Sequence, residues 1–168
     1  MKVTGRARLL GDDINTDYVI SSARKRATID PHALAPYLLE SIAPDFAASV
    51  RPGDVIVAGR NFGCGSAMEV AVTVIQAAGF GAVIARSFAR SFFRNAINNG
   101  LLVVECDTTS IAEGDQLVVE VEGGHVVVRN VSQGGLLTGA DLPEIVQRLI
   151  EHGGLVPYLS ARGGFGND

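Results

Sequence analysis

The sequence predicts a mixed α/β fold in which residues 1–168 form a single domain with a parallel-strand core, crossover helices and peripheral antiparallel strands. The chain has 168 residues, of which 47% are hydrophobic and 19% charged, so it is long and apolar enough to bury one substantial core. Residues 54–105 alternate short apolar runs with helix-like segments, which is typical of right-handed parallel crossovers. Residues 114–130 predict an antiparallel hairpin that turns at Glu122-Gly123-Gly124.

Ahead of the crossovers, the sequence predicts one strand, two loops and short helices. In order, we expect a strand over residues 3–10, a turn-prone acidic loop over 11–17, a short extended stretch over 18–20 and an exposed loop over 21–28. Asp30 and Pro31 suit the N-cap and the first position of a helix, and Pro36 predicts that this helix is short or broken.

The crossover and C-terminal regions supply the remaining elements. Strands are expected over residues 54–58, 81–85 and 101–105, helices over 69–78, 86–99 and 140–152, and a frayed tail over 160–168. Gly79 and Gly100 follow the first two helices, as glycine commonly does at a helix end.

Charge and cysteine content exclude several classes of protein. The net charge of −4 gives no reason to expect nucleic acid or an anionic membrane as a partner, because both favour a basic face. No apolar run has the length of a signal peptide or a membrane span, so we expect a cytoplasmic location. Cys64 and Cys106 are too few for a disulfide framework or, unaided, an iron–sulfur cluster. Asp12, Asp13 and Asp17 cluster, but turn formation is their expected role, and we expect no metal on this chain.

One short stretch, GRNFGCGSAMEVAV over residues 59–72, carries most of the candidate chemistry. It lies between a buried strand and a helix, where backbone N–H groups and the helix dipole favour an anion. Its glycine spacing matches neither a Walker motif nor a dinucleotide fingerprint. Ser66 is followed three residues later by Glu69, which predicts a capping box at the helix start. The glycines also favour a carboxylate lying against the backbone, with Cys64 filling the loop.

Three segments of the chain resemble a known family. GDDINTDYVISSAR, VIVAGRNFGCGS and AVIARSFARSFFRNAINNGLLVVE together resemble the small subunit of 3-isopropylmalate dehydratase, which corresponds to the swivelling domain of aconitase. The resemblance implies a β/β/α swivelling domain and a hydro-lyase that reversibly dehydrates and rehydrates a hydroxy polycarboxylate in leucine biosynthesis. It also implies a heteromer in which a separate large subunit carries the [4Fe–4S] cluster, so that this chain binds no cofactor.

The serine loop departs from the family pattern, which usually reads GSSREH. In the family, the first serine is the base that moves a proton at the carbon next to a carboxylate, and the arginine helps to bind substrate. Ser66 matches that serine, Glu69 is retained, and Ala67 and Met68 replace the second serine and the arginine. The backbone around Ser66, including Gly65 and Ala67, is then expected to hold a carboxylate. Losing the arginine removes a contact of about 1.5–3 kcal/mol. Three explanations of the missing arginine stay open: another cation compensates for it, the substrate has one carboxylate fewer, or the protein is not a working isomerase.

The basic segment over residues 21–28 also departs from the family, which commonly has Tyr-Leu after an Ala-Arg pair. Here Arg24 is followed by Lys25 and Arg26. The resemblance implies that Arg24 reaches a substrate carboxylate. Lys25 and Arg26 are candidates for the charge missing at Met68, and the alternative is a solvated basic loop.

Two further pairs of residues fall on segments that match the family. Thr16 and Asp17 lie on the segment that faces the site, so we include them among the candidate substrate-binding residues. Arg90 and Arg94 lie on a predicted helix between two strands, where pairing with acidic neighbours or with carbonyl groups is the expected role and contact with substrate is the alternative.

These features favour the small subunit of a hydro-lyase acting on a hydroxy di- or tricarboxylic acid such as isopropylmalate. One alternative is a dehydratase for a different hydroxy diacid, because both substrate-reading positions are altered. Another is a non-catalytic small subunit that binds a large subunit or a metabolite. Ser66 in its glycine loop favours the enzyme, and the lost arginine favours the non-catalytic alternative.

Overall fold

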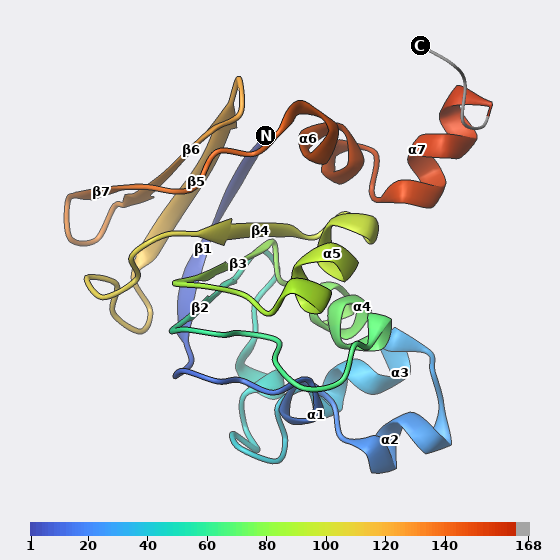
Figure 1. Ribbon diagram of the computed structural model, residues 1–168. Helices are drawn as coiled ribbons and strands as arrows, with labels where there is room; N and C mark the ends of the chain where they lie inside the picture. The colour runs from blue at the N-terminus through green and yellow to red at the C-terminus, as the bar shows by residue number, and fades with distance from the viewer. Residues whose placement is uncertain (164–168) are drawn as a thin grey trace.

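The structure, a computed structural model, describes residues 1–163 and contains a seven-stranded mixed sheet of order β4-β3-β2-β1-β5-β6-β7 (Figure 1). The strands are β1 (Lys2–Leu9), β2 (Val55–Ala58), β3 (Ala82–Ala85), β4 (Leu102–Glu105), β5 (Gln116–Glu122), β6 (His125–Asn130) and β7 (Gly135–Thr138). Strands β1 to β4 run parallel to one another, and β5 to β7 are antiparallel to their neighbours. The predicted α/β class, with a parallel core and peripheral antiparallel strands, is confirmed.

Two crossover helices connect the parallel strands. Helix α4 (Glu69–Ala77) joins β2 to β3, and α5 (Arg90–Asn98) joins β3 to β4. They end where predicted, because Gly79 and Gly100 have φ of 100° and 73°, which glycine tolerates best. All residues of β2 and β3 are buried, as expected for parallel strands that are covered on both faces.

The antiparallel half contains the predicted hairpin and one further strand. Glu122 of β5 pairs with His125 of β6, and the two turn residues, Gly123 and Gly124, have positive φ of 58° and 91°. Positive φ at both positions is the conformation of a tight type I′ turn. Strand β7 is not predicted by the sequence, because GLLT is short and shows no buried face, with Leu136 62% exposed.

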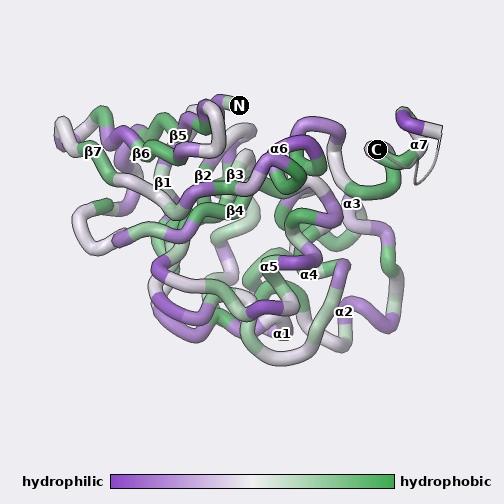
Figure 2. The backbone as a smooth tube through the Cα atoms, turned by 45° about the horizontal axis from the view of Figure 1, so that its top comes forward, coloured by the Kyte–Doolittle hydropathy of each residue, from purple (hydrophilic) through white to green (hydrophobic). Residues whose placement is uncertain are grey.

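The sheet curls so that hydrophobic cores lie on both of its faces. Ile56 and Val83 belong to the core that includes α4 and α5, whereas Val57 and Ile84 belong to the core shared with β5 and β6. This alternation is the two-residue period of a strand. The result is a β/β/α arrangement of layers, as the family resemblance implies. In Figure 2, hydrophobic segments gather toward the middle of the molecule and hydrophilic segments, α2 among them, lie toward the outside.

Short helices occupy the region between β1 and β2. They are α1 (Thr16–Val19), α2 (Ser22–Ala27), α3 (Pro31–Leu34) and two 3₁₀ turns, η1 (Ala35–Tyr37) and η2 (Ala47–Ser49). The predicted extended stretch over 18–20 is wrong at Tyr18 and Val19, which belong to α1. The predicted exposed loop over 21–28 is also wrong, because α2 forms there. Helix α2 has no buried residue and therefore no apolar periodicity that the sequence could reveal.

Two helices close the described part of the chain, α6 (Glu144–Glu151) and α7 (Leu155–Arg162). The predicted terminal helix corresponds to α6, which begins after Pro143, and α7 is not predicted by the sequence. Of the predicted frayed tail, residues 160–162 belong to α7, and residues 164–168 lie outside the described residues.

A buried carboxylate at the amino-terminal edge of the parallel strands is paired with two arginines. Asp54, immediately before β2, is 2% exposed. Arg6 donates to its two oxygens over 3.0 and 2.7 Å, and Arg8 Nη1 lies 3.6 Å from Oδ2. Burial alone would raise the pKa of Asp54, but hydrogen bonds from Arg6 and from the backbone of Arg51 outweigh it and hold that pKa below its ordinary value of 3.8.

Candidate active site

Three loops meet at the carboxyl-terminal edge of the parallel strands, where open α/β sheets commonly bind ligands. They are residues 10–15 after β1, residues 59–68 after β2, which we call the serine loop, and residues 86–89 after β3. The N–H of Gly63 donates to the carbonyl of Ile14 over 2.8 Å, and the N–H of Thr16 donates to the carbonyl of Cys64 over 2.9 Å. Phe62 bonds the third loop through both its N–H and its carbonyl, over 3.0 and 2.9 Å. The backbone of the serine loop is therefore fixed from both sides.

The glycines of the serine loop make room for this protein's own side chains. A Cβ atom on Gly63 would lie 2.2 Å from the ring of Phe92, and one on Gly65 would lie 2.5 Å from Asn15 Oδ1. Both glycines also have positive φ, of 79° and 89°. The space that these glycines were expected to leave for a carboxylate is therefore filled at both positions.

Ser66 is exposed, and its hydroxyl group is free. Its carbonyl oxygen accepts a hydrogen bond from Thr16 Oγ1 over 2.9 Å, and Thr16 is 1% exposed, so the position of the loop is set from the buried side. Within residues 1–163, Ser66 Oγ forms no hydrogen bond, and the backbone N–H groups of residues 65–68 have no acceptor. The loop thus combines an unpaired hydroxyl with a run of unpaired N–H donors.

The predicted capping box at Ser66 is wrong. Helix α4 begins at Glu69, its N-cap residue is Met68 in an extended conformation, and no side chain caps it. Thr16 holds the carbonyl of Ser66, which keeps Ser66 two residues upstream of the cap position. Because no side chain caps α4, its N-terminus remains available to an anion.

Lys25 of α2 reaches the serine loop. Its Nζ donates to Asp17 Oδ1 over 3.0 Å and also contacts Met68 Sδ. The side chain of Lys25 is only 15% exposed, so the ammonium group is held between Asp17 and the loop. Hydrogen bonds from Lys25 and Ser22 hold the pKa of Asp17 below its ordinary value. A cation therefore lies beside Met68, the position where the family has arginine.

Within residues 1–163, Arg24 and Arg26, on either side of Lys25, form no hydrogen bond or ion pair with the serine loop. Arg24 donates from Nε and Nη2 to the carboxylate of Glu40, each over 2.9 Å, and its guanidinium lies 3.6 Å from the ring centroid of Tyr37. The hydrogen bonds raise the pKa of Arg24 and lower that of Glu40. Arg26 is exposed and forms no ion pair with any residue in the described part of the chain. Of the three predicted cations, Lys25 is the one bonded to the serine loop, and carboxylate binding by Arg24 stays a prediction.

Asp12 and Asp13 hold the loops together. Asp12 Oδ1 accepts the backbone N–H of Arg60 over 2.6 Å, and Asp13 Oδ1 accepts Asn61 Nδ2 over 2.7 Å. Residues 1–163 contain no group of three or more His, Cys, Asp or Glu side chains arranged to hold a metal ion.

The cysteines of this chain do not fit an iron–sulfur cluster, which takes several thiolate ligands. Burial raises the pKa of the Cys64 thiol, and the charge of Asp13 raises it further. Burial also raises the pKa of Cys106 to about 11. Both side chains therefore remain protonated thiols at neutral pH, which are poor ligands and weak nucleophiles.

Two residues that position this region, Asn15 and Glu40, were not predicted from the sequence. Asn15 accepts the N–H of Asp17 over 2.8 Å and fills the space beside Gly65. Its Asn-Thr-Asp context is a local signal for such a turn and would have identified it. Glu40 positions Arg24 from the turn that follows η1, and no local pattern connects the two.

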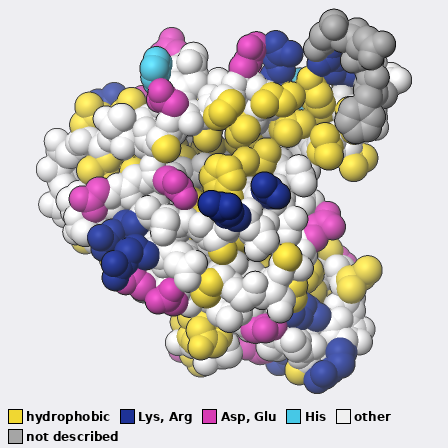
Figure 3. Space-filling model, viewed as in Figure 1, with side chains coloured by type: hydrophobic (Ala, Val, Ile, Leu, Met, Phe, Trp, Pro, Cys, Tyr) yellow, Lys and Arg dark blue, Asp and Glu magenta, His cyan; other side chains and the backbone are white. Residues whose placement is uncertain are grey.

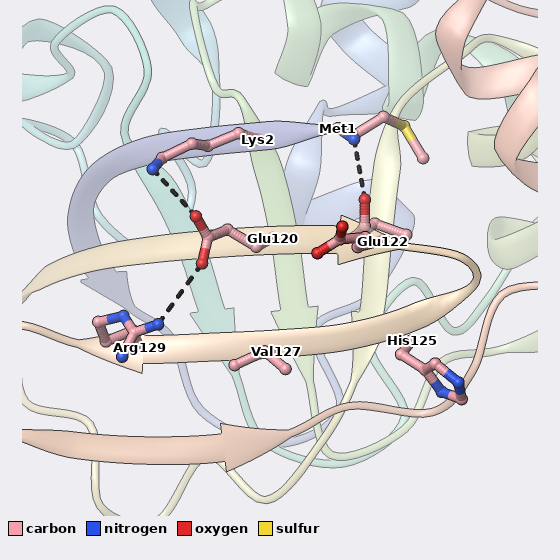
Figure 4. A pocket seen from close by; sticks show the side chains of 8 residues that line it. Met1, Lys2, Glu120, Glu122, His125, Val127 and Arg129 are labelled. Carbon is pink, nitrogen blue, oxygen red and sulfur yellow. Dashed lines mark hydrogen bonds and ion pairs between the residues drawn. The ribbon is translucent and has the colours of Figure 1, made fainter.

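A wide hollow on the outer face of β1, β5 and β6 is built from other elements than the serine loop (Figure 4). It encloses about 800 Å³. Glu120 there pairs with Lys2 over 3.0 Å and with Arg129 over 3.6 Å, and these side chains are exposed. Exposed pairs of this kind contribute little to stability. We assign the hollow no part in the candidate active site.

Residues 42–109 match the family model of the aconitase C-terminal domain. Together with the serine loop at the carboxyl-terminal edge, this match defines a domain of the aconitase type. None of the helices within residues 1–163 has the length and apolar character of a membrane span.

Individual relatives narrow the assignment. The chain is 43% identical to the isopropylmalate/citramalate isomerase small subunit of Methanocaldococcus jannaschii over 95% of each chain. It is 46% identical to the 3-isopropylmalate dehydratase small subunit of Heliobacterium modesticaldum, covering 96% of this chain and 97% of that one. The crystal structure of 3-isopropylmalate dehydratase from M. jannaschii matches with a TM-score of 0.90 at 40% identity, over 97% of this chain and 96% of that one. The chain belongs to the 3-isopropylmalate dehydratase small-subunit family, and the predicted resemblance is confirmed.

Proposed function

We propose that this chain is the small subunit of a hydro-lyase that isomerises a hydroxy dicarboxylic acid by dehydration and rehydration. Ser66 carries the proposal, because its exposed hydroxyl lies beside unpaired N–H donors on a loop fixed by Thr16. The names of the relatives, which include isopropylmalate and citramalate, support a substrate of that size and charge. We assign catalysis to the complex with a separate large subunit, in the cytoplasm.

Ser66 acts in this proposal as the base at the carbon next to a substrate carboxylate. The N–H groups of residues 65–68 and the uncapped start of α4 bind that carboxylate and orient the carbon–hydrogen bond toward Ser66 Oγ. The same donors favour the deprotonated hydroxyl, because they offer hydrogen bonds to a negative oxygen. The chain itself thus binds the carboxylate, orients the substrate and moves one proton.

Lys25 replaces the cation that the family supplies at position 68. An ammonium group has three donors, so Lys25 can keep its bond to Asp17 while donating to a substrate carboxylate. A charge-assisted contact of this kind contributes about 1.5–3 kcal/mol, similar to the loss expected from the missing arginine. Arg24 and Arg26 remain candidates for a second carboxylate, and Thr16, Asp17 and Ala67 shape the site around them.

The cysteines described above do not fit a cluster, so we assign the expected [4Fe–4S] cluster to the large subunit. The departure of the substrate hydroxyl is assigned to that subunit as well. The acidic net charge of −4 supports neither nucleic acid nor an anionic membrane as a further partner.

The test is anaerobic reconstitution with the large subunit encoded in the same genome, followed by turnover of isopropylmalate, citramalate and other hydroxy diacids. The wild-type complex should convert at least one of them, and Ser66→Ala should lower kcat about 10²–10⁴-fold, the usual contribution of a positioned base. Subunit association and the melting temperature should not change in this variant. Normal turnover by Ser66→Ala would refute the assigned base.

Met68 favours one competing function, a small subunit that assembles but does not catalyse. That alternative predicts a stable complex that turns over none of the diacids, although a relative's small subunit restores activity to the same large subunit. The enzyme hypothesis predicts turnover by both complexes.

A further inference from the structure

We infer that Phe88, Arg90, Phe93 and Arg94 form a docking surface for an acidic segment of the large subunit. We call this set the arginine patch. The inference rests on the proposed function, in which a large subunit must approach Ser66. It assigns the partner a definite chemistry: an apolar side chain flanked by carboxylates.

The arginine patch surrounds a hollow of about 300 Å³ that Glu105 also lines. The rings of Phe88 and Phe93, both half-buried, have centroids 6.0 Å apart, so the hollow has an apolar wall. Figure 3 shows basic side chains beside hydrophobic ones at the position that α5 occupies in Figure 1. The two rings contact each other and form this one wall, against which an apolar side chain of a partner can pack while the arginines remain at the rim.

The two arginines have no counter-charge within the described chain. Both are exposed, and neither forms an ion pair with any residue from 1 to 163, so the pairing expected from the sequence is wrong. Glu105, the nearest carboxylate in the hollow, accepts the backbone N–H of Phe88 over 3.1 Å instead. Six other arginines lie within 3.6 Å of a carboxylate oxygen, namely Arg6, Arg8, Arg24, Arg60, Arg129 and Arg148. Arg26, Arg51 and Arg86 also form no ion pair within residues 1–163, but none of them lines this hollow.

The positions of Arg90 and Arg94 do not favour the isolated helix. Arg90 is the first residue of α5, where the helix dipole disfavours a cation. Arg94 lies one turn later, and like charges four residues apart repel each other. An acidic partner relieves both effects at once. Buried aromatic and arginine side chains are also the residues that most often dominate binding at protein interfaces.

The arginine patch is continuous with the candidate active site. The N–H of Ala89 donates to the carbonyl of Phe62 in the serine loop over 2.9 Å. The ring of Phe62 also meets that of Phe88 edge to face, with centroids 6.0 Å apart. A subunit that shares a substrate with Ser66 must face this edge of the sheet, so the patch lies within its reach.

A second copy of this chain is a poorer occupant. Two-fold symmetry over the patch would bring the arginines of one copy against those of the other, because a two-fold interface uses the same surface on both subunits. The repulsion between them opposes such a dimer. An acidic surface on a different chain is therefore the occupant that the charges favour.

The test measures the affinity of the full-length chain for the large subunit, anaerobically and without substrate. Arg90→Glu should weaken binding about ten-fold and Arg90→Glu/Arg94→Glu about a hundred-fold, with a loss that shrinks as salt is added. Arg51→Glu is the matched control, since Arg51 is exposed at the opposite, amino-terminal edge of β2. It should bind like the wild type. None of these variants should have a lower melting temperature than the wild type, because none of the three arginines forms an ion pair within residues 1–163.

The outcomes separate this inference from the proposed function. If the wild type binds and turns over substrate while the double variant binds equally well, the docking surface is refuted and the function stands. A higher KM with unchanged affinity for the large subunit would assign the arginines to substrate and overturn the inference. Loss of self-association alone would favour a second copy and also overturn it. If the wild type fails to bind the large subunit, the proposed function itself fails.

Discussion

The polar groups at the two edges of the parallel strands differ in burial and in hydrogen bonding. At the amino-terminal edge, Asp54 is buried and bonded to Arg6, with Arg8 beside it. At the carboxyl-terminal edge, the hydroxyl of Ser66 and the guanidinium groups of Arg90 and Arg94 are exposed and unpaired within residues 1–163. Paired groups at one edge stabilise the strands, and free groups at the other remain available to substrate and partner. The residues that stabilise the fold therefore lie at one end of the parallel strands, and the residues assigned to function lie at the other end.

The largest expected effect is on stability, at the amino-terminal edge. Asp54→Ala should lower the free energy of unfolding by about 3 kcal/mol, because it removes the buried carboxylate that pairs with Arg6, while Arg8 keeps its ion pair with Glu113. Urea unfolding of the purified chain measures this loss. Ser66→Ala is the matched control at the other edge and should change stability by less than about 0.5 kcal/mol. Equal effects of the two substitutions would contradict the proposed separation.

The same carboxylate should also give the amino-terminal edge a pH signature. The pKa of Asp54 is lower in the folded protein than its ordinary value of 3.8, so the unfolded chain binds the proton more readily. The stabilisation is then complete above about pH 4 and is lost as pH falls through the folded pKa. We expect the stability difference between the wild type and Asp54→Asn to shrink below pH 4. A difference that stays constant between pH 6 and pH 3 would contradict the pairing.

At the carboxyl-terminal edge, the next effect is on substrate binding. Lys25→Ala should raise KM about 10–100-fold, because it removes a charge-assisted contact of about 1.5–3 kcal/mol beside Met68. Steady-state kinetics of the reconstituted complex measures it. Arg129→Ala, which removes an exposed cation from the hollow on the outer face of β5 and β6, should leave KM unchanged.

A second variant distinguishes a lost charge from a lost contact. Met68→Arg in the Lys25→Ala background should recover much of the affinity, because it returns a cation to the position where the family has one. In the wild-type background, the new arginine would lie against Lys25 and should not improve binding. Recovery in both backgrounds would show that Lys25 does not supply the missing charge.

The smallest effect is expected at Thr16, which contributes both to stability and to the position of Ser66. Thr16→Val removes the hydrogen bond to the Ser66 carbonyl and should cost about 1 kcal/mol of stability, the usual net value of one such bond. It should also lower kcat, because Ser66 is held less firmly, and Thr16→Ser should restore both properties. A variant with reduced stability and unchanged kcat would limit Thr16 to a structural role.

The sequence predicted the parts of the fold that local patterns determine. Continuous apolar runs identified β2 and β3, and glycines identified the ends of α4 and α5. Helix α2 was missed because it has no buried residue and therefore no apolar periodicity, and it is held instead by ion pairs with Asp17 and Glu40.

In the candidate site as well, the sequence predicted what depends on local pattern and missed what depends on contacts between distant residues. Ser66 was identified from its glycine context and its resemblance to the family. The predicted cap was wrong, because a hydroxyl fifty positions away, on Thr16, fixes the loop. The contact of Lys25 with Met68 also joins segments far apart in the chain, so the sequence left Lys25 and Arg26 equivalent.

The occupied space around Gly63 and Gly65 restricts how this enzyme can diversify. Any side chain at either position would collide with Phe92 or Asn15, so neither can be recruited to recognise a new molecule. Variation must enter at Ala67 and Met68 or from α2, where substitution leaves the fixed backbone intact. Met68 and Lys25 are the pair at which this chain departs from the pattern that the family resemblance implies. A directed-evolution library for new hydroxy acids should therefore conserve the glycines and randomise those neighbouring positions.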